Sequence, residues 1–359
     1  MKTDFEPYPI GTVFNPLKLG KSISPVFTSV EIKFPSRLNA MAIDPGKITS
    51  NKNMVYTPGE VVFSIKLYAN IKVKTTSQKG QIKVSSGSKR RNLIKHAVLL
   101  MREALGDDTG LEIEVGNDVE LRHAGLGSSS RLISSAAAAV NELYGRPVSF
   151  KRLARYVAQN HGEEIDGDNK NLNPVQCIGG SAVSGLYSGG LFVITGETVV
   201  VGKMNVDSTK KVVLGIPKEY KEVDSKSQFD EEKRNLDKFL NTGKKHGPII
   251  AYKILHHGLP AMKNNNLGPM GDIIYEYRFH MGSIKNCSYV YPPMVDITNN
   301  FRFLKEKKLV DILAISSIGP TVFAITDDIK PIIKAFGEQG LNTMVTEIEN
   351  ERYQVLKKH

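Results

Sequence analysis

The sequence has no tryptophan and only two cysteines among its 359 residues. Cys177 and Cys287 lie far apart and in no metal-ligand spacing, so neither a disulfide framework nor a zinc site is indicated. No apolar run approaches the length that crosses a bilayer, and residues 1–6 lack the apolar core of a signal peptide. We therefore expect a cytoplasmic protein without a membrane partner.

Positive charge is in excess, with a formal net charge of +11. This excess suits anionic ligands, but the lysines are scattered along the chain rather than gathered in one arm. The aromatic residues form no pattern typical of an RNA-binding sheet. We therefore expect small-molecule substrates rather than nucleic acid as partners. The oligomeric state stays open, a homodimer included.

The length of the chain allows two domains with separate cores. The composition changes after Gly202, which places the expected boundary near residue 205, between domains 1–205 and 206–359. Hydrophobic periodicity predicts strands and helices in both halves, an α+β fold, with Pro35 ending the first strand. The expected strands cover residues 30–34, 61–67, 71–75, 111–115, 191–195, 211–217, 322–326 and 342–348, and the principal helices cover 92–105, 129–143, 149–158 and 328–337.

A glycine- and serine-rich turn precedes the helix expected at 129–143. Its two glycines allow a tight turn, and the N-terminus of a helix carries unpaired N–H groups and about half a positive charge. Successive serine hydroxyls add donors to phosphate or an oxygen ligand to Mg²⁺. The alternative is a serine N-cap on an ordinary helix. We interpret this turn as a phosphate-binding loop made of Gly125, Leu126, Gly127, Ser128, Ser129 and Ser130.

Three other polar segments are candidates for function. Arg37 and Asp44 follow the first strand; Arg37 could bind phosphate or carboxylate and Asp44 a substrate hydroxyl, or the two could form a structural pair. The acidic segment 163–173 is either a metal site or a surface loop, and the absence of a regular ligand spacing favours the loop. The glycines of 179–185 predict a close backbone approach beside the phosphate-binding loop, or flexible turns around a hairpin.

Taken together, residues 35–39, 125–130 and 316–321 resemble the three motifs of the GHMP kinase superfamily, the small-molecule kinases named for galactose, homoserine, mevalonate and phosphomevalonate. The resemblance implies an N-terminal domain like ribosomal protein S5 domain 2, a ferredoxin-like C-terminal domain and a nucleotide between them. ATP and Mg²⁺ would then be the expected donor and cofactor. A relative that only binds a nucleotide or nucleic acid is a further alternative.

Within the superfamily, the Pro-Ser-Arg start at residue 35 and residues 316–324 resemble the archaeal β-ribofuranosylaminobenzene 5′-phosphate (β-RFAP) synthase branch. Members of that branch join phosphoribosyl pyrophosphate to a hydroxy- or aminobenzoate, with loss of CO₂ and pyrophosphate, in tetrahydromethanopterin-type pterin biosynthesis. Many GHMP kinases carry a catalytic Asp in a Ser-Gly-x-Asp sequence, whereas residues 184–187 contain no acid. This absence favours the synthase, although Asn39 replaces a histidine of the branch. The resemblance therefore implies a synthase-like transferase with phosphoribosyl pyrophosphate as the donor, and an ATP-dependent small-molecule kinase is the alternative.

The resemblance also implies roles for single residues. Ser129 would ligate Mg²⁺ or phosphate, and the amides of 125–130 would hold the diphosphate. Arg37 would bind the acceptor carboxylate or a 5-phosphate, so that Arg37 and Ser129 are the expected catalytic groups. The remaining substrate-binding candidates are Asn39, Asp44, Ser184, Ser317, Gly319 and Thr321.

Overall fold

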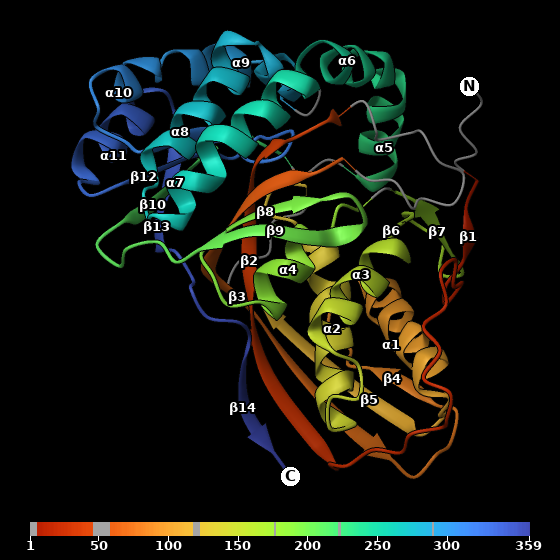
Figure 1. The fold of residues 1–359 in the computed structure, drawn as a ribbon. Coiled ribbons are helices and arrows are strands. Elements are labelled where there is room, and N and C mark those ends of the chain that lie inside the picture. The colour runs from red at the N-terminus through yellow and green to blue at the C-terminus, as the bar shows by residue number, and fades with distance from the viewer. Residues whose placement is uncertain (1–5, 46–57, 118–122, 176, 222–223, 289–290) are drawn as a thin grey trace.

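The computed structural model describes residues 6–45, 58–117, 123–175, 177–221, 224–288 and 291–359 (Figure 1). Its largest sheet has seven strands and fills the N-terminal half. Strands β14, β2, β3, β5 and β4 follow one another, and β8 joins β3 and β9 beside this path. These strands are β2 (Ser29–Ala42), β3 (Glu60–Thr76), β4 (Ile82–Val84), β5 (Gly110–Asn117), β8 (Leu191–Thr195), β9 (Val199–Met204) and β14 (Gln354–Lys358).

Two smaller sheets complete the β-structure of the described residues. A four-stranded sheet in the order β11-β12-β10-β13 belongs to the C-terminal half, and a three-stranded sheet in the order β1-β7-β6 lies near the N-terminus. The larger contains β10 (Lys211–Pro217), β11 (Ile312–Ile315), β12 (Val322–Thr326) and β13 (Leu341–Glu347); the smaller contains β1 (Tyr8–Pro9), β6 (Gly162–Glu164) and β7 (Asn171–Pro174).

Helices cover one face of the seven-stranded sheet and form most of the upper layer in Figure 1. The helices on the sheet are α1 (Arg91–Leu105), α2 (Ser128–Leu143), α3 (Phe150–Gln159) and α4 (Gly180–Leu186). The helices of the upper layer are α5 (Ser225–Arg234), α6 (Leu236–Lys253), α7 (Leu259–Lys263), α8 (Gly268–Tyr275), α9 (Met294–Asn299), α10 (Arg302–Glu306) and α11 (Lys330–Glu338). Short turns of 3₁₀ or π type are η2 (Gly196–Thr198), η3 (Ile254–Gly258), η4 (Glu276–His280) and η5 (Ser283–Cys287). The predicted α+β class is confirmed.

Two strand predictions were wrong. Pro35 does not end β2, because the pairing register with β3 shifts between Pro35 and Ser36 and the strand continues to Ala42. A bulge accommodates proline because proline has no N–H to donate to the ladder. The strands expected at 61–67 and 71–75 are one continuous strand, β3. Both corrections extend the sheet, and the first carries Arg37 and Asn39 on a strand rather than in a loop.

The end of the chain returns to the N-terminal half. Strand β14 pairs antiparallel with β2, with Val355 opposite Ile32, while β13 pairs with β10 in the other sheet. Residues 354–358 thus belong to the seven-stranded sheet, although the expected C-terminal domain runs to residue 359. The division near residue 205 otherwise stays a prediction.

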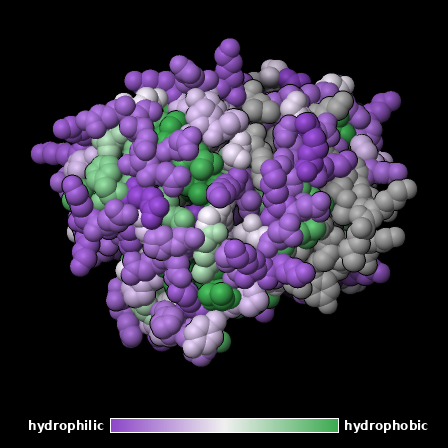
Figure 2. All heavy atoms as spheres, turned by 90° about the horizontal axis from the view of Figure 1, so that it is seen from above, coloured by the Kyte–Doolittle hydropathy of each residue, from purple (hydrophilic) through white to green (hydrophobic). Residues whose placement is uncertain are grey.

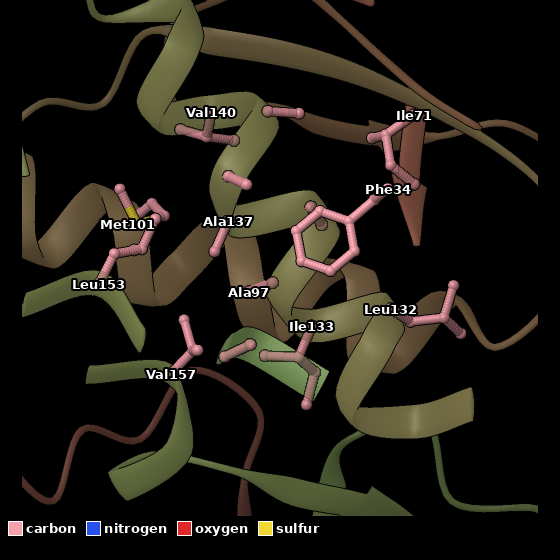
Figure 3. Close-up of a cluster of buried hydrophobic side chains, with 14 of the residues drawn as sticks. Phe34, Ile71, Ala97, Met101, Leu132, Ile133, Ala137, Val140, Leu153 and Val157 are labelled. Atoms are coloured by element: carbon pink, nitrogen blue, oxygen red, sulfur yellow. The ribbon is translucent and has the colours of Figure 1, made fainter. Parts of the chain in front are cut away.

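The core of the N-terminal half is packed between the sheet and its helices (Figure 3). Phe34 and Ile71 point from the strands toward the alanine-rich helix α2, whose Ala137 lies near Ala97 of α1. Small side chains let these helices approach closely. Helix α4 packs tightly against strand β2, since a Cβ on Gly185 would stand 2.0 Å from Cζ of Phe34. This contact fixes α4, and with it the residues at the start of α4, against β2.

The surface seen from above the helical layer is mostly hydrophilic, with hydrophobic residues in separate places (Figure 2). Among the described residues, no helix combines the length and the apolar character that a membrane span requires.

Candidate functional site

The loop 125–130 is a tight turn that leads directly into a helix. Gly125 has a φ of +83° and Gly127 a φ of +68°, and α2 begins at the next residue, Ser128. A Cβ on Gly125 would lie 2.5 Å from the carbonyl oxygen of Ser316, and one on Gly127 would lie 2.6 Å from Oγ of Ser181. Both positions therefore require glycine. The first turn of α2 presents N–H groups that the helix itself leaves without acceptors.

The turn 316–321 holds this loop from the C-terminal half. The Ser316 hydroxyl donates to the carbonyl oxygen of Gly125 at 2.6 Å and accepts from the backbone N–H of Asn39 at 3.0 Å. The Thr321 hydroxyl donates to the carbonyl oxygen of Ala124 at 2.5 Å. The three segments that resemble motifs thus meet in space. Because the hydroxyl of Thr321 is buried and bonded to the backbone, it supports the loop, and its contact with substrate stays a prediction.

Arg37 lies directly beside the loop. Its Nη1 donates to the carbonyl oxygen of Gly125 at 3.2 Å, and its Nε stands 3.1 Å from the point where a Cβ on Gly127 would be. The guanidinium is half-buried, and planar, fixed donors of this kind suit phosphate or carboxylate. The structure therefore brings the predicted Arg37 and the predicted loop together.

A second arginine, Arg90, was missed in the sequence, and it joins the loop to the acidic segment. Its Nε donates to Glu164 at 3.0 Å, its Nη1 donates to Oγ of Ser128 at 3.1 Å, and its Nη2 donates to Glu163. Glu163 and Glu164 are buried on β6 rather than exposed, so the interpretation of 163–173 as a surface loop was wrong for both. Their charge is balanced by an arginine 73 and 74 residues away in sequence, which no local pattern indicates.

Ser129 and Glu163 form a pair of oxygen donors at the start of α2. The Ser129 hydroxyl hydrogen-bonds to the Glu163 carboxylate. Burial alone would raise the pKa of Glu163, but Arg90, His123 and the Ser129 hydroxyl hold it below its ordinary value, so the group is ionised at neutral pH. Among the described residues, no three His, Cys, Asp or Glu side chains converge on a metal position. A single carboxylate and a hydroxyl beside a phosphate loop nevertheless fit Mg²⁺, which takes its other ligands from phosphates and water.

The other predicted substrate residues are placed less uniformly. Ser317 has a φ of +57° and its N–H donates to the carbonyl oxygen of Asn39 at 2.8 Å, while the carbonyl oxygen of Gly319 lies 3.3 Å from the Cβ position of Gly125. Asp44 lies beyond β2, where its Cγ is 3.2 Å from the Cβ position of Gly247 on α6. Ser184 is fully buried on α4, where its carbonyl oxygen accepts from Ser64 and its own hydroxyl has no hydrogen-bond partner within the described part of the chain.

Helix α4 starts beside the loop, as the glycines of 179–185 predict. The Ser181 hydroxyl shares a hydrogen bond of 2.6 Å with the Ser130 hydroxyl. It also lies 3.4 Å from the carbonyl oxygen of Gly127. The segment is a helix rather than a set of hairpin turns. Its contact with the loop is made by Ser181, which sequence reasoning did not select.

Arg278, which follows helix α8, is a further residue that the sequence did not reveal. It is 5% exposed and lies in η4. Its Nε donates to the carbonyl oxygen of Ala40 at 2.7 Å, and its Nη2 donates to those of Ile315 at 2.9 Å and Ser317 at 3.1 Å. A single side chain thereby ties β2, which carries Arg37, to the turn 316–321.

Lowering the pH should destabilise the protein through His161, which is buried close to Glu163. Burial lowers the pKa of His161 to about 4, from an ordinary value of 6.5. The neutral ring is thus favoured in the folded state, so the full stability is present above about pH 6.5 and is lost as the pH falls toward about 4. We expect a loss of about 2 kcal/mol in the free energy of unfolding between about pH 7.5 and pH 5, measured by urea titration. His161→Asn should reduce this loss, and an unchanged loss would contradict the assignment.

Comparisons with known proteins agree with this geometry. Residues 92–178 match the family model described as the GHMP kinases N terminal domain, and this match includes the loop, Ser129 and Glu163. A comparison with curated protein sequences found no match. The fold is similar to that of homoserine kinase from Cytophaga hutchinsonii, with a TM-score of 0.60 and 15% identity over 94% of this chain and 100% of that one.

Two further solved structures have the same fold. Mevalonate diphosphate decarboxylase from Staphylococcus aureus has a TM-score of 0.65 and 17% identity over 92% of this chain and 99% of its own. L. major mevalonate kinase, in complex with R-mevalonate, has a TM-score of 0.58 and 12% identity over 92% and 99% of the two chains. The chain therefore matches the GHMP kinase N-terminal domain at residues 92–178, within an overall fold that it shares with homoserine kinase, mevalonate kinase and mevalonate diphosphate decarboxylase.

Proposed function

We propose that this protein transfers the γ-phosphoryl group of Mg²⁺-bound ATP to the hydroxyl of a small molecule. The observation that carries the proposal is the Ser129–Glu163 pair in the first turn of α2, beside backbone N–H groups that a helix N-terminus leaves without acceptors. Phosphoryl transfer requires mainly positioning and neutralisation of charge, and these groups are suited to both.

Each part of the site has a role in this reaction. The amides of residues 127–130 would bind the β- and γ-phosphates, with Arg90 fixing Ser128 and Glu163 behind them. Ser129 and Glu163 would hold Mg²⁺, which when bound neutralises charge on the phosphate oxygens. Arg37, on the other side of Gly127, would bind the acceptor through a carboxylate or a phosphate group. Packing of the turn 316–321 on the loop keeps these groups in register.

Calorimetry with Mg²⁺ and each donor tests the proposal. We expect binding of ATP and no binding of phosphoribosyl pyrophosphate. Phosphoryl transfer is then measured with a panel of small alcohols. The panel includes homoserine and mevalonate, which appear in the names of two kinases of similar fold. Failure to bind ATP in the presence of Mg²⁺ would refute the proposal.

A second candidate function is the β-RFAP-synthase-like reaction with phosphoribosyl pyrophosphate and a hydroxy- or aminobenzoate. Two observations favour it: residues 184–187 contain no acid, and residues 316–324 carry the sequence that resembles the synthase branch. In that reaction pyrophosphate is the leaving group and no strong general base is required. Release of labelled CO₂ from a carboxyl-labelled benzoate would support it. Binding of RNA that weakens with salt, without binding of either donor, would instead indicate a non-catalytic relative.

Arg37→Met should weaken acceptor binding more than donor binding. The substitution removes the planar donors while it keeps an apolar stem of similar length, and loss of a charged hydrogen bond costs about 1.5–3 kcal/mol. We therefore expect the KM for the acceptor to rise by about tenfold or more, with a smaller change in the KM for ATP. Arg37→Lys keeps the charge without the fork and should recover only part of the effect. An unchanged acceptor KM would remove Arg37 from the acceptor site.

A further inference from the structure

A buried carboxylate lies behind Arg37, outside the groups assigned above. Glu60 is the first residue of β3 and is 2% exposed. The side-chain amide of Asn39 donates to its Oε2, and the backbone N–H of Gly180 donates to the same carboxylate. Arg37 supplies the neighbouring positive charge. Burial of a carboxylate at the start of this strand carries a free-energy cost that an apolar residue would avoid.

The position of this carboxylate relative to α4 is specific. A Cβ on Gly180 would lie 2.4 Å from Oε1 of Glu60, so the carboxylate occupies the space that a side chain at residue 180 would fill. The next residue, Ser181, is hydrogen-bonded to Ser130 in the phosphate-binding loop. Glu60 therefore places an acid at the start of α4, one residue from a side chain that touches the loop.

Arg37 links this acid to the reacting end of the site. Its guanidinium lies beside Gly127 on one side, and its charge acts on Glu60 on the other. Within the described residues, the titratable groups acting on Glu60 are Arg37 on β2 and Cys177, which precedes α4 and whose own pKa burial raises to about 12. Burial also raises the pKa of Glu60, while Arg37 and the two amides act against that rise. A carboxylate in such surroundings is a stronger proton acceptor than one in water.

We propose that Glu60 is the catalytic proton acceptor for the hydroxyl of the acceptor molecule, supplying from β3 the acid that residues 184–187 lack. The proposal rests on the kinase function proposed above. The hydroxyl oxygen forms a bond to the γ-phosphorus, and the bond from that phosphorus to the bridging oxygen of ADP breaks. ADP leaves with the bonding electron pair, and the hydroxyl proton passes to the Glu60 carboxylate, which later releases it to water.

The test compares Glu60→Gln, Glu60→Asp and Ser64→Ala with the wild type. Ser64→Ala removes a buried hydrogen bond on the same strand and controls for disturbance of β3. Phosphoryl transfer is followed across pH, with Mg²⁺·ATP binding measured by calorimetry. We expect Glu60→Gln to lower kcat by about 100-fold or more, to leave ATP affinity within about threefold, and to lose the acidic limb of the kcat profile. Glu60→Asp keeps that limb at a reduced kcat, and it provides the comparison if the Gln variant does not fold.

The outcomes separate this proposal from the one on which it rests. If the wild type binds ATP and transfers phosphate but Glu60→Gln retains the acidic limb, Glu60 is not the proton acceptor, while the kinase function stands. A drop in kcat for Ser64→Ala equal to that for Glu60→Gln would also overturn the role of Glu60. If the wild type binds no ATP and phosphorylates no alcohol, the kinase function fails, and the role of Glu60 fails with it.

Discussion

Glu163→Gln should lower Mg²⁺-dependent phosphoryl transfer by at least about 100-fold, the larger of the effects expected at the donor site. Glu163 is ionised, buried and hydrogen-bonded to Ser129 at the start of α2. An amide of the same shape keeps an acceptor for Arg90 but removes the negative charge that a hard cation requires. The experiment measures kcat against Mg²⁺ concentration, and we expect half-maximal activity to move to a much higher Mg²⁺ concentration.

Glu164→Gln is the matched control for this change. Glu164 is the neighbouring carboxylate, it is also buried, and it pairs with the same arginine at 3.0 Å. Each variant removes one of the two ion pairs of Arg90, whereas only Glu163→Gln changes the carboxylate that is hydrogen-bonded to Ser129. Ser129→Ala should in turn lower turnover by at least about tenfold, with a loss of about 1 kcal/mol in stability. Equal effects of the two glutamine variants on Mg²⁺ dependence would show that Glu163 serves only the ion pair.

Arg278→Met should destabilise the fold by about 3 kcal/mol or more. The substitution leaves the carbonyl oxygens of Ala40, Ile315 and Ser317 buried without their charged donor. The free energy of unfolding is measured by urea titration at neutral pH. Because the same contacts align β2 with the turn 316–321, the variant should also lose affinity for ATP in calorimetry below its unfolding transition.

The control for this change is Arg302→Met on α10. Arg302 is partly exposed, pairs with Glu306 at 3.8 Å, and lies far from the loop in sequence. Its loss should change stability by no more than about 1 kcal/mol. If Arg278→Met were no more destabilising than this control, the three carbonyl contacts would not hold the halves together.

Local patterns were sufficient to predict the loop and most of the elements around it. The alternation in 111–115, the two glycines and the alanine-rich run describe a strand, a turn and a helix that form from neighbouring residues. The structure confirms α1, β5 and α2 within one or two residues of their predicted ends. These elements needed no information about the rest of the chain, because periodicity and turn chemistry are local properties.

Pairings across long stretches of sequence could not be predicted in this way. The acidic residues 163 and 164 resemble an exposed loop until Arg90 is known to lie against them. Arg278 belongs to no motif, and its structural role comes from hydrogen bonds to three carbonyl oxygens more than 30 residues away in sequence. Glu60 gives the same lesson, since only the fold brings it in front of Gly180. Charged residues inside a protein are explained by their partners, which sequence order does not reveal.

The hydrogen bonds from Ser316 and Thr321 to the loop can form only after most of the chain has been synthesised. The loop and its helix emerge from the ribosome nearly two hundred residues before the two hydroxyls that fix their backbone. During that interval the growing chain already displays the glycine turn without its C-terminal support. A chain that ends before residue 316 therefore lacks both of the hydroxyls that hold the backbone of the loop.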